Sequence, residues 1–272
     1  MSEDRRAMEA IGFVGVWIGA GLFLRLDPNT YLLIGVPLLW LFQRYVRREA
    51  LASLWVQGAA SFDLKGIDWL VVLLLMAVPA VGIVTAVRDW NIINFLWWVC
   101  SLFGAIPAAF SLRNVSRMGS PRQAVVYALI AVGIGGGQWA LSALGGGHSA
   151  MPRISALPEL LENFLSYFTV CFVLEEVVFR GAIDSHVALA GVRDWPAMSS
   201  ALLVSGLWGL WHLPVVHAMN GKENLVLAAA GLVIVHSLVG IPLSFCWRKG
   251  GILALPAAAH ALIDAYRNII AG

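Results

Sequence analysis

The sequence predicts an all-α fold, a polytopic bundle of transmembrane helices. Of the 272 residues, 60% are hydrophobic and only 12% are charged, whereas charged residues make up about 25% of a typical soluble chain. The apolar residues gather into long stretches, and a helix needs roughly 20 such residues to cross the hydrocarbon core of a bilayer. Lipid is therefore the expected solvent for much of the chain.

Nine stretches of the sequence are candidate spans. They are residues 8–25, 30–44, 67–87, 91–112, 123–144, 160–180, 195–216, 224–246 and 251–270. The second is short and contains Pro37, which favours a re-entrant or interfacial segment. The sixth is the least hydrophobic because it contains Glu162, Glu175 and Glu176. We therefore expect eight or nine spans.

The distribution of Lys and Arg predicts the orientation. With the N-terminus inside, the inside segments hold 12 of these residues and the outside segments hold 5, Arg180 being set aside with its motif. Basic residues are enriched in cytoplasmic loops, so we expect a cytoplasmic N-terminus. The stretch from Arg44 to Leu64 has a basic start and scattered apolar residues, which fits an amphipathic helix on the membrane surface or a plain loop.

Several other classes of protein are disfavoured. No basic cluster of the kind that binds nucleic acid is present. The three cysteines, Cys100, Cys171 and Cys246, lie in apolar runs, which favours a packing role over disulfides. The first apolar run has no small-residue cleavage site, so it reads as a retained span. Without an internal repeat or long linker, one continuous membrane domain is the simplest organisation.

Ionisable residues inside the predicted spans are the informative ones, because each costs about 2.5–3.5 kcal/mol on insertion scales. They fall in the last four spans and are Glu175, Glu176, Arg180, His212, His236, His260 and Asp264.

The first group lies in the run EEVVFRG. Glu176 and Arg180 are four residues apart and can pair on one helical face. Glu175 points about 100° away and has no local partner. A desolvated carboxylate of this kind suits general-base chemistry. The alternative is a buried ion-pair network that fixes helix packing, which accounts for Glu176 and Arg180 but poorly for Glu175.

The second group is Trp208 and His212, again four apart, with the indole placed to orient the imidazole. Pro214 follows and predicts a kink or a freed carbonyl nearby. An interfacial tryptophan belt with a histidine near the headgroups would give the same pattern.

The third group is His260 and Asp264, also four apart. A hydrogen bond between them would set the tautomer of the imidazole. A buried pair that joins two helices, or a proton relay in a transporter, fits as well.

The remaining histidines have simpler interpretations. His236 is adequately explained by a hydrogen bond between helices. His217 does not face the same way as His212, and His148 and His186 are expected to be solvated in loops. The sequence contains neither an HExxH zinc motif nor a serine nucleophile elbow.

The three segments EEVVFRG (175–181), WGLWH (208–212) and HALID (260–264) together resemble the CAAX-protease and bacteriocin-processing family, and are similar to type II CAAX prenyl endopeptidases. The family pattern is EExxxR, FxxxH and HxxxN or HxxxD on separate membrane helices. The resemblance covers residues from about 157 to 270. Residues 1–150 are then N-terminal membrane helices without a recognised motif, and residues 151–272 a catalytic core.

The resemblance implies a role for each motif residue. Glu175 would be the general base that activates water, with His212 helping to hold that water. Glu176 and Arg180 would be the supporting pair. His260 and Asp264 would line the other side, near the developing oxyanion.

Two positions depart from the family pattern. Trp208 stands where the family usually has Phe and would serve as an aromatic shelf. Asp264 stands where the prenyl endopeptidases have Asn, and a carboxylate donates to an oxyanion only when it is protonated. Asp264 could instead orient His260 or help to bind a metal.

The expected protein is an intramembrane endopeptidase of the bacterial cytoplasmic (inner) membrane. Its partners would be the lipid bilayer and a membrane-associated or lipid-anchored protein substrate, with no nucleic acid. The sequence specifies no cofactor with certainty, and a divalent metal such as zinc stays an open alternative, since a glutamate and two histidines could supply its ligands. The alternatives are a non-catalytic immunity or binding member of the family and a proton-coupled transporter, the latter disfavoured by the absence of duplicated halves.

Overall fold

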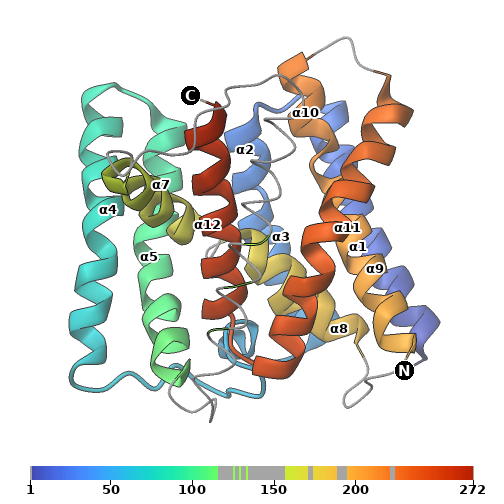
Figure 1. The fold of residues 1–272 in the computed structure, drawn as a ribbon, viewed down its shortest axis with the longest axis horizontal. Helices are drawn as coiled ribbons and strands as arrows, with labels where there is room; N and C mark the ends of the chain where they lie inside the picture. The colour runs from blue at the N-terminus through green and yellow to red at the C-terminus, as the bar shows by residue number, and fades with distance from the viewer. Residues whose placement is uncertain are drawn as a thin grey trace.

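Long apolar helices dominate the computed structural model of the chain (Figure 1). The structure describes residues 2–115, 157–170, 174–188, 195–220 and 224–271, together with Val125, Leu129 and Gly133. Within these residues the only extended pairing is an isolated β-bridge between Val56 and Ile252. The predicted all-α class is confirmed.

The described part of the chain contains the following helical elements. In chain order they are α1 (Glu3–Phe23), α2 (Pro28–Leu33), α3 (Gly35–Leu41), the π-helix η1 (Phe42–Arg47), the 3₁₀ turn η2 (Leu51–Leu54), α4 (Asp68–Arg88), α5 (Ile92–Val115), α7 (Leu157–Val170), the π-helix η6 (Val177–Asp184), α8 (Ser185–Val187), α9 (Trp195–Trp211), α10 (Leu213–Asn220), α11 (Leu225–Gly250) and α12 (Ala254–Ala271).

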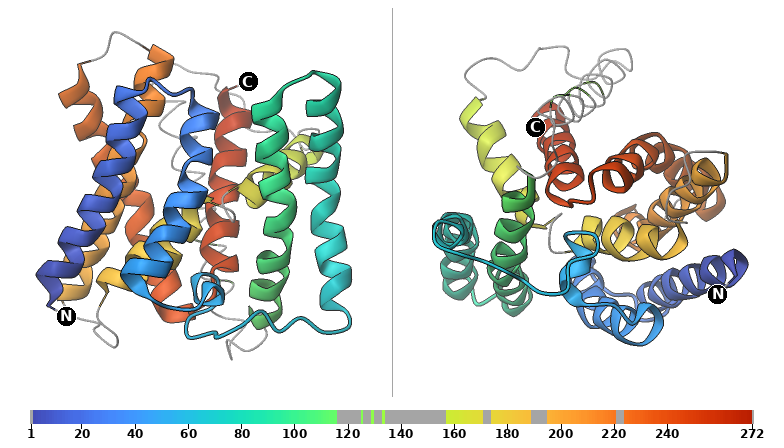
Figure 2. Two further views of the ribbon diagram at one scale, coloured as in Figure 1. Left: turned by 180° about the vertical axis from the view of Figure 1, so that it is seen from behind. Right: turned by 90° about the horizontal axis from the view of Figure 1, so that it is seen from below.

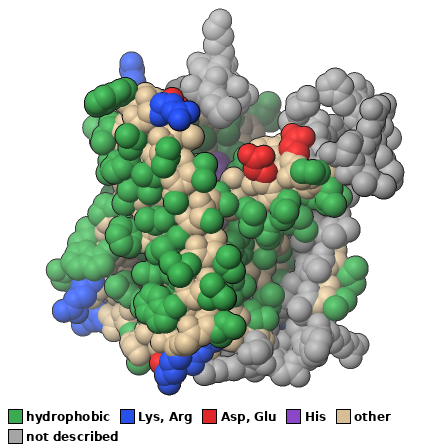
Figure 3. Space-filling view, turned by 90° about the vertical axis from the view of Figure 1, so that its left-hand side faces the viewer, with side chains coloured by type: hydrophobic (Ala, Val, Ile, Leu, Met, Phe, Trp, Pro, Cys, Tyr) green, Lys and Arg blue, Asp and Glu red, His purple; other side chains and the backbone are tan. Residues whose placement is uncertain are grey.

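The protein is an integral, multi-pass membrane protein. Within the described residues, five helical stretches are long and apolar enough to cross a bilayer: Glu3–Phe23, Asp68–Arg88, Ile92–Val115, Ala197–Val216 and Leu225–Gly250. Figure 3 shows that hydrophobic side chains cover most of the face over α4 and α5, whereas Lys and Arg lie toward its two ends. An apolar belt between charged ends is the surface that a bilayer requires.

The agreement between the predicted spans and the structure is best where the structure has long helices. The predicted span 123–144 lies outside the described residues apart from three helical positions. The predicted short span 30–44 is interrupted, because α2 ends at Leu33 and α3 begins at Gly35. The start of α1 and the end of α12 lie at opposite ends of the bundle (Figure 2).

Residues 44–64 form no long surface helix, because η1 ends at Arg47 and η2 contains only Leu51–Leu54. The segment folds inward instead, and Leu54 is only 1% exposed. Arg47 Nη1 donates to the carbonyl of Gly181 at 2.9 Å. A Cβ on Gly181 would collide with the carbonyl oxygen of Leu54, so the glycine that ends the EEVVFRG run lets this loop pack beneath η6.

The N-terminal helices pack directly against the helix that carries His212. The Tyr31 hydroxyl donates to the carbonyl of Trp211 at 2.8 Å, and Trp17 Nε1 donates to the carbonyl of Tyr31 at 2.9 Å. The predicted break beside Pro214 is present, since α9 ends at Trp211 and α10 begins at Leu213. A buried aromatic cluster therefore fixes the end of α9 from the N-terminal side.

Gly21 provides a test of this packing. A Cβ on Gly21 would lie 2.6 Å from two ring atoms of Tyr31 and 2.9 Å from Pro214 Cβ. We expect Gly21→Ala to lower the free energy of unfolding by about 1–3 kcal/mol, as overpacked cores do, measured by thermal unfolding in detergent. The control is Gly15→Ala, also within α1, whose Cβ would have no neighbour within 4 Å. Equal melting temperatures for the two variants would contradict the packing.

Candidate active site

The side chains singled out in the sequence meet inside the bundle. Glu175 and Glu176 come immediately before η6, His212 follows the last residue of α9, and His260 and Asp264 lie on α12. Glu176 is completely buried, and His260 and Asp264 are 4% and 8% exposed. Three segments far apart in the sequence therefore contribute to one polar cluster in an apolar surrounding.

Glu175 finds its partners on other helices. Its Oε2 accepts a hydrogen bond from Trp208 Nε1 at 3.2 Å. The same oxygen lies 3.6 Å from His212 Nε2 and 3.9 Å from His260 Nε2. The prediction that Glu175 lacks a partner on its own helix fits this geometry, and the facing groups come from α12 and from α9 with the residue that follows it.

Glu176 holds both a cation and an imidazole. Its Oε2 lies 3.4 Å from Arg180 Nε, so the predicted pair is present with both side chains fully buried. Its Oε1 lies 2.9 Å from His260 Nδ1. The short stretch of π-helix that contains Arg180 is a winding that occurs often at functional sites.

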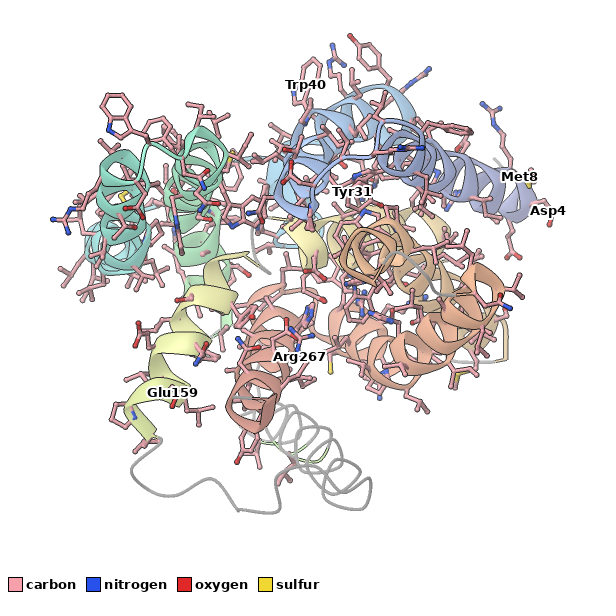
Figure 4. All side chains as sticks on the ribbon, turned by 90° about the horizontal axis from the view of Figure 1, so that it is seen from above. Asp4, Met8, Tyr31, Trp40, Glu159 and Arg267 are labelled. Carbon is pink, nitrogen blue, oxygen red and sulfur yellow. The ribbon has the colours of Figure 1, made fainter. Side chains whose placement is uncertain are left out.

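The tautomer of His260 is set by Glu176 and not by Asp264, which corrects the expectation from spacing. An ionised carboxylate only accepts hydrogen bonds, so His260 Nδ1 carries a hydrogen that it donates to Glu176. Asp264 Oδ2 is farther away, 3.5 Å from His260 Nε2. Asp264 Oδ1 lies 3.1 Å from Nη1 of Arg267, which is labelled on α12 in Figure 4. Asp264 thus has a cationic partner that the motif comparison did not anticipate.

His212 also has a defined tautomer. Its Nδ1 lies 2.9 Å from the carbonyl oxygen of Trp208, and because a carbonyl only accepts, the hydrogen is on Nδ1. The lone pair of Nε2 then faces Glu175.

His236 lies beside the cluster, which sequence reasoning did not predict. Its ring contacts that of His212 in a tilted arrangement, with the centroids 4.2 Å apart, and meets Trp208 edge-on at 4.7 Å. Its Nδ1 donates to the carbonyl of Leu232 in its own helix at 2.8 Å, so the expected hydrogen bond between helices is replaced by ring contacts. The free-energy cost of placing an imidazole inside a membrane span was the one feature of the sequence that pointed to His236.

The described residues contain no group of three or more His, Cys, Asp or Glu side chains arranged to hold a metal ion. The donors expected to supply zinc ligands are Glu175 Oε2, His212 Nε2 and His260 Nε2, and the oxygen lies 3.6 and 3.9 Å from the two nitrogens.

The remaining histidines and the cysteines have the following positions. The solvated position expected for His186 is wrong: it is 6% exposed, and its Nε2 lies 2.9 Å from Glu9 Oε2. Burial lowers the pKa of His186 from its ordinary value. Cys100 is a free thiol, and Cys246 is buried. Cys171, His148 and the side chain of His217 lie outside the described part of the chain.

Replacing one member of the buried Glu176–Arg180 pair should cost more stability than replacing both. Glu176→Gln should lower the free energy of unfolding by about 3–5 kcal/mol, because it leaves the fully buried Arg180 without a counter-charge. The double variant Glu176→Gln with Arg180→Met should recover part of that loss in thermal unfolding. The control is Lys65→Gln, which breaks an exposed pair with Asp63 and should change little. If Glu176→Gln unfolds like the control, the buried pair is not ionised.

The comparison with known families agrees with this geometry. Residues 157–266 match the family model described as type II CAAX prenyl endopeptidase Rce1-like. The match begins at the first residue of α7 and contains every motif residue from Glu175 to Asp264. Comparisons with curated proteins and with solved structures gave no match. Residues 157–266 are therefore an Rce1-like domain, similar to the type II CAAX prenyl endopeptidases.

Proposed function

We propose that the protein hydrolyses a peptide bond of a membrane-associated or lipid-anchored protein with water activated by Glu175. The observation that carries the proposal is the approach of His212 Nε2 and His260 Nε2 to one carboxylate oxygen, at 3.6 and 3.9 Å, inside the bundle. A desolvated carboxylate next to two oriented imidazoles is suited to removing a proton.

In this scheme a water molecule bridges Glu175 and His212, whose Oε2 and Nε2 atoms lie 3.6 Å apart. Both His212 Nε2 and an ionised Glu175 are acceptors, so they cannot hydrogen-bond to each other directly. A water that donates one hydrogen to each satisfies both groups. Its oxygen lone pairs are then free to attack a carbonyl carbon.

The polar cluster has no net charge when one of its imidazoles carries an additional proton. The charged groups are three carboxylates and two guanidinium groups, from Glu175, Glu176, Asp264, Arg180 and Arg267. A single proton on His260 makes the sum neutral. His260 then donates Nδ1–H to Glu176 and presents Nε2–H to the site, where it can stabilise an oxyanion.

The proposed reaction follows from these positions. Glu175 takes a proton from the bound water as the water oxygen bonds to the scissile carbonyl carbon. The carbonyl oxygen becomes an oxyanion beside His260 Nε2. When the C–N bond breaks, the proton held by Glu175 passes to the amine nitrogen, and the products are a carboxylic acid and an amine. Each step conserves protons and returns Glu175 to its ionised form.

Asp264 acts in this scheme as an ionised group. Its Oδ1 lies 3.1 Å from Arg267 Nη1, and as a carboxylate it has no hydrogen to donate to the oxyanion. It would instead favour the protonated form of His260 from 3.5 Å. The replacement of the Asn of prenyl endopeptidases by Asp therefore changes a donor into a charge that supports His260.

We further propose a bacterial cytoplasmic membrane with the N-terminus inside. The start of α1 and the end of α11 lie at the same end of the bundle (Figure 1). They carry Arg5, Arg6, Arg248 and Lys249, as expected of a cytoplasmic end. Ends of the chain on opposite sides correspond to an odd number of spans, which favours nine over eight. The contact of Tyr31 with Trp211 supports one continuous membrane domain across residues 1–150 and 151–272.

The role of Glu175 is tested by Glu175→Gln. The amide keeps the shape and can still accept from Trp208, but it cannot take a proton from water. We expect kcat to fall by about 10²–10⁴-fold, the usual contribution of general-base catalysis, with melting temperature nearly unchanged. Cleavage of a membrane-anchored peptide in liposomes is the measurement. Glu162→Gln, an exposed carboxylate on α7, is the matched control, and equal turnover of the two variants would disprove the role.

Metal removal separates a carboxylate mechanism from a zinc mechanism. Because Glu175 activates the water in our scheme, dialysis against a zinc chelator should leave kcat within about 2-fold of the untreated protein, well below the contribution of an activating group. Metal analysis of the dialysed sample confirms that the treatment worked. A loss of activity that added zinc restores would contradict the scheme.

A further inference from the structure

Trp208 contacts the polar cluster through both its N–H group and its ring face. The indole is 2% exposed. Its Nε1–H donates to Glu175 Oε2 at 3.2 Å. Its face is covered by Arg180, whose Cζ lies 4.5 Å from the ring centroid. A phenylalanine, the residue usual in the related proteases, could supply the face but not the N–H.

The indole is the hydrogen-bond donor to Glu175 within the described residues. The neighbouring imidazole nitrogens, at 3.6 Å for His212 and 3.9 Å for His260, are beyond normal hydrogen-bond distance. A carboxylate without a donor would be free to rotate about its terminal torsion, which has a broad energy profile. The bond from Trp208 therefore fixes the plane in which Glu175 presents its lone pairs.

Arg180 acts on this hydrogen bond through the ring. Its Nη1 and Nη2 have no hydrogen-bond partner among the residues that the structure describes. Its charge is directed instead to Glu176 at 3.4 Å and to the indole face. A cation over an aromatic face is attracted to the π electrons, and it polarises the ring so that the N–H becomes a stronger donor.

We propose that Trp208 is a positioning residue that couples the Glu176–Arg180 pair to Glu175. The pair holds the guanidinium on the indole face, and the indole N–H holds Oε2 of Glu175 in the orientation that the reaction needs. This inference rests on the proposed role of Glu175 as the base, and it adds a link between the two glutamates that phenylalanine cannot provide.

The chain offers a matched pair of variants for the test. Trp211 lies on the same helix, is 1% exposed, and packs edge-on against His212 at 4.9 Å. Its Nε1 has no hydrogen-bond partner within the described residues. Trp208→Phe and Trp211→Phe therefore remove the same volume from buried positions, but only the first removes a hydrogen bond to a carboxylate.

We expect Trp208→Phe to lower kcat by about 10-fold or more, which is the worth of a hydrogen bond to a charged group. KM should stay within about 2-fold, because the indole contacts the base and not the substrate. Trp211→Phe should keep kcat within about 3-fold of the wild type. Equal values of kcat for the two variants would overturn the inference.

A measurement without catalysis keeps this test independent of the proposed function. The fall in melting temperature caused by Trp208→Phe should be smaller in a Glu175→Ala background than in the wild type, because the hydrogen bond is already gone. Trp211→Phe should cause the same fall in both backgrounds. Additive effects for Trp208 and Glu175 would overturn the inference, even if Glu175→Gln abolishes cleavage.

An isosteric replacement covers the case in which Trp208→Phe does not fold. Benzothienylalanine, placed at position 208 by codon suppression, has the shape of tryptophan with sulfur in place of the N–H. It should fold with a smaller fall in melting temperature than Trp208→Phe, because only the hydrogen bond is lost, and lose kcat by about 10-fold. Full activity of this protein would overturn the inference. Full activity of Glu175→Gln would instead overturn the proposed function, and the stability coupling would still decide whether the hydrogen bond forms.

Discussion

The ion pair between Glu176 and Arg180, both without solvent exposure, is the interaction on which the site depends. Charges in an apolar bundle are tolerated only when they are paired and hydrogen-bonded. Glu176 meets that requirement by binding Arg180 and His260 together. The guanidinium of Arg180 is paired with Glu176 but has no hydrogen-bond partner within the described residues. It covers the face of Trp208 instead, and the indole donates to Glu175. The contacts that accompany the buried Glu176–Arg180 pair thus fix the positions of the side chains that face the proposed water.

The N-terminal helices contribute packing instead of motif residues. Tyr31 fixes the end of α9 through the carbonyl of Trp211, immediately before His212. Arg47 binds the carbonyl of Gly181, at the end of the run that begins with Glu175. Residues 1–115 therefore hold in place the two segments that carry Glu175 and His212. This explains how a part of the chain outside the matched family region can matter for the geometry of the Rce1-like domain.

Sequence reasoning succeeded where the relevant contact lies within one helix. The four-residue spacing predicted the Glu176–Arg180 pair and the approach of His212 to Trp208. It failed where contacts depend on how helices pack. Spacing assigned His260 to Asp264, whereas Glu176 from another segment holds its Nδ1. Three further features also depend on segments that are distant in the sequence, so no local periodicity predicts them. They are the inward fold of the loop before Leu54, the burial of His186 and the ring contact of His236 with His212.

The central claim is that Glu175 and His212 hold the reacting water. A high-resolution structure with a bound substrate peptide tests it most directly. We predict an ordered water within hydrogen-bond distance, about 2.6–3.2 Å, of the Glu175 carboxylate and His212 Nε2, placed against the scissile carbonyl carbon. A metal ion bound at about 2.0–2.2 Å to His212, His260 and Glu175 would contradict the account.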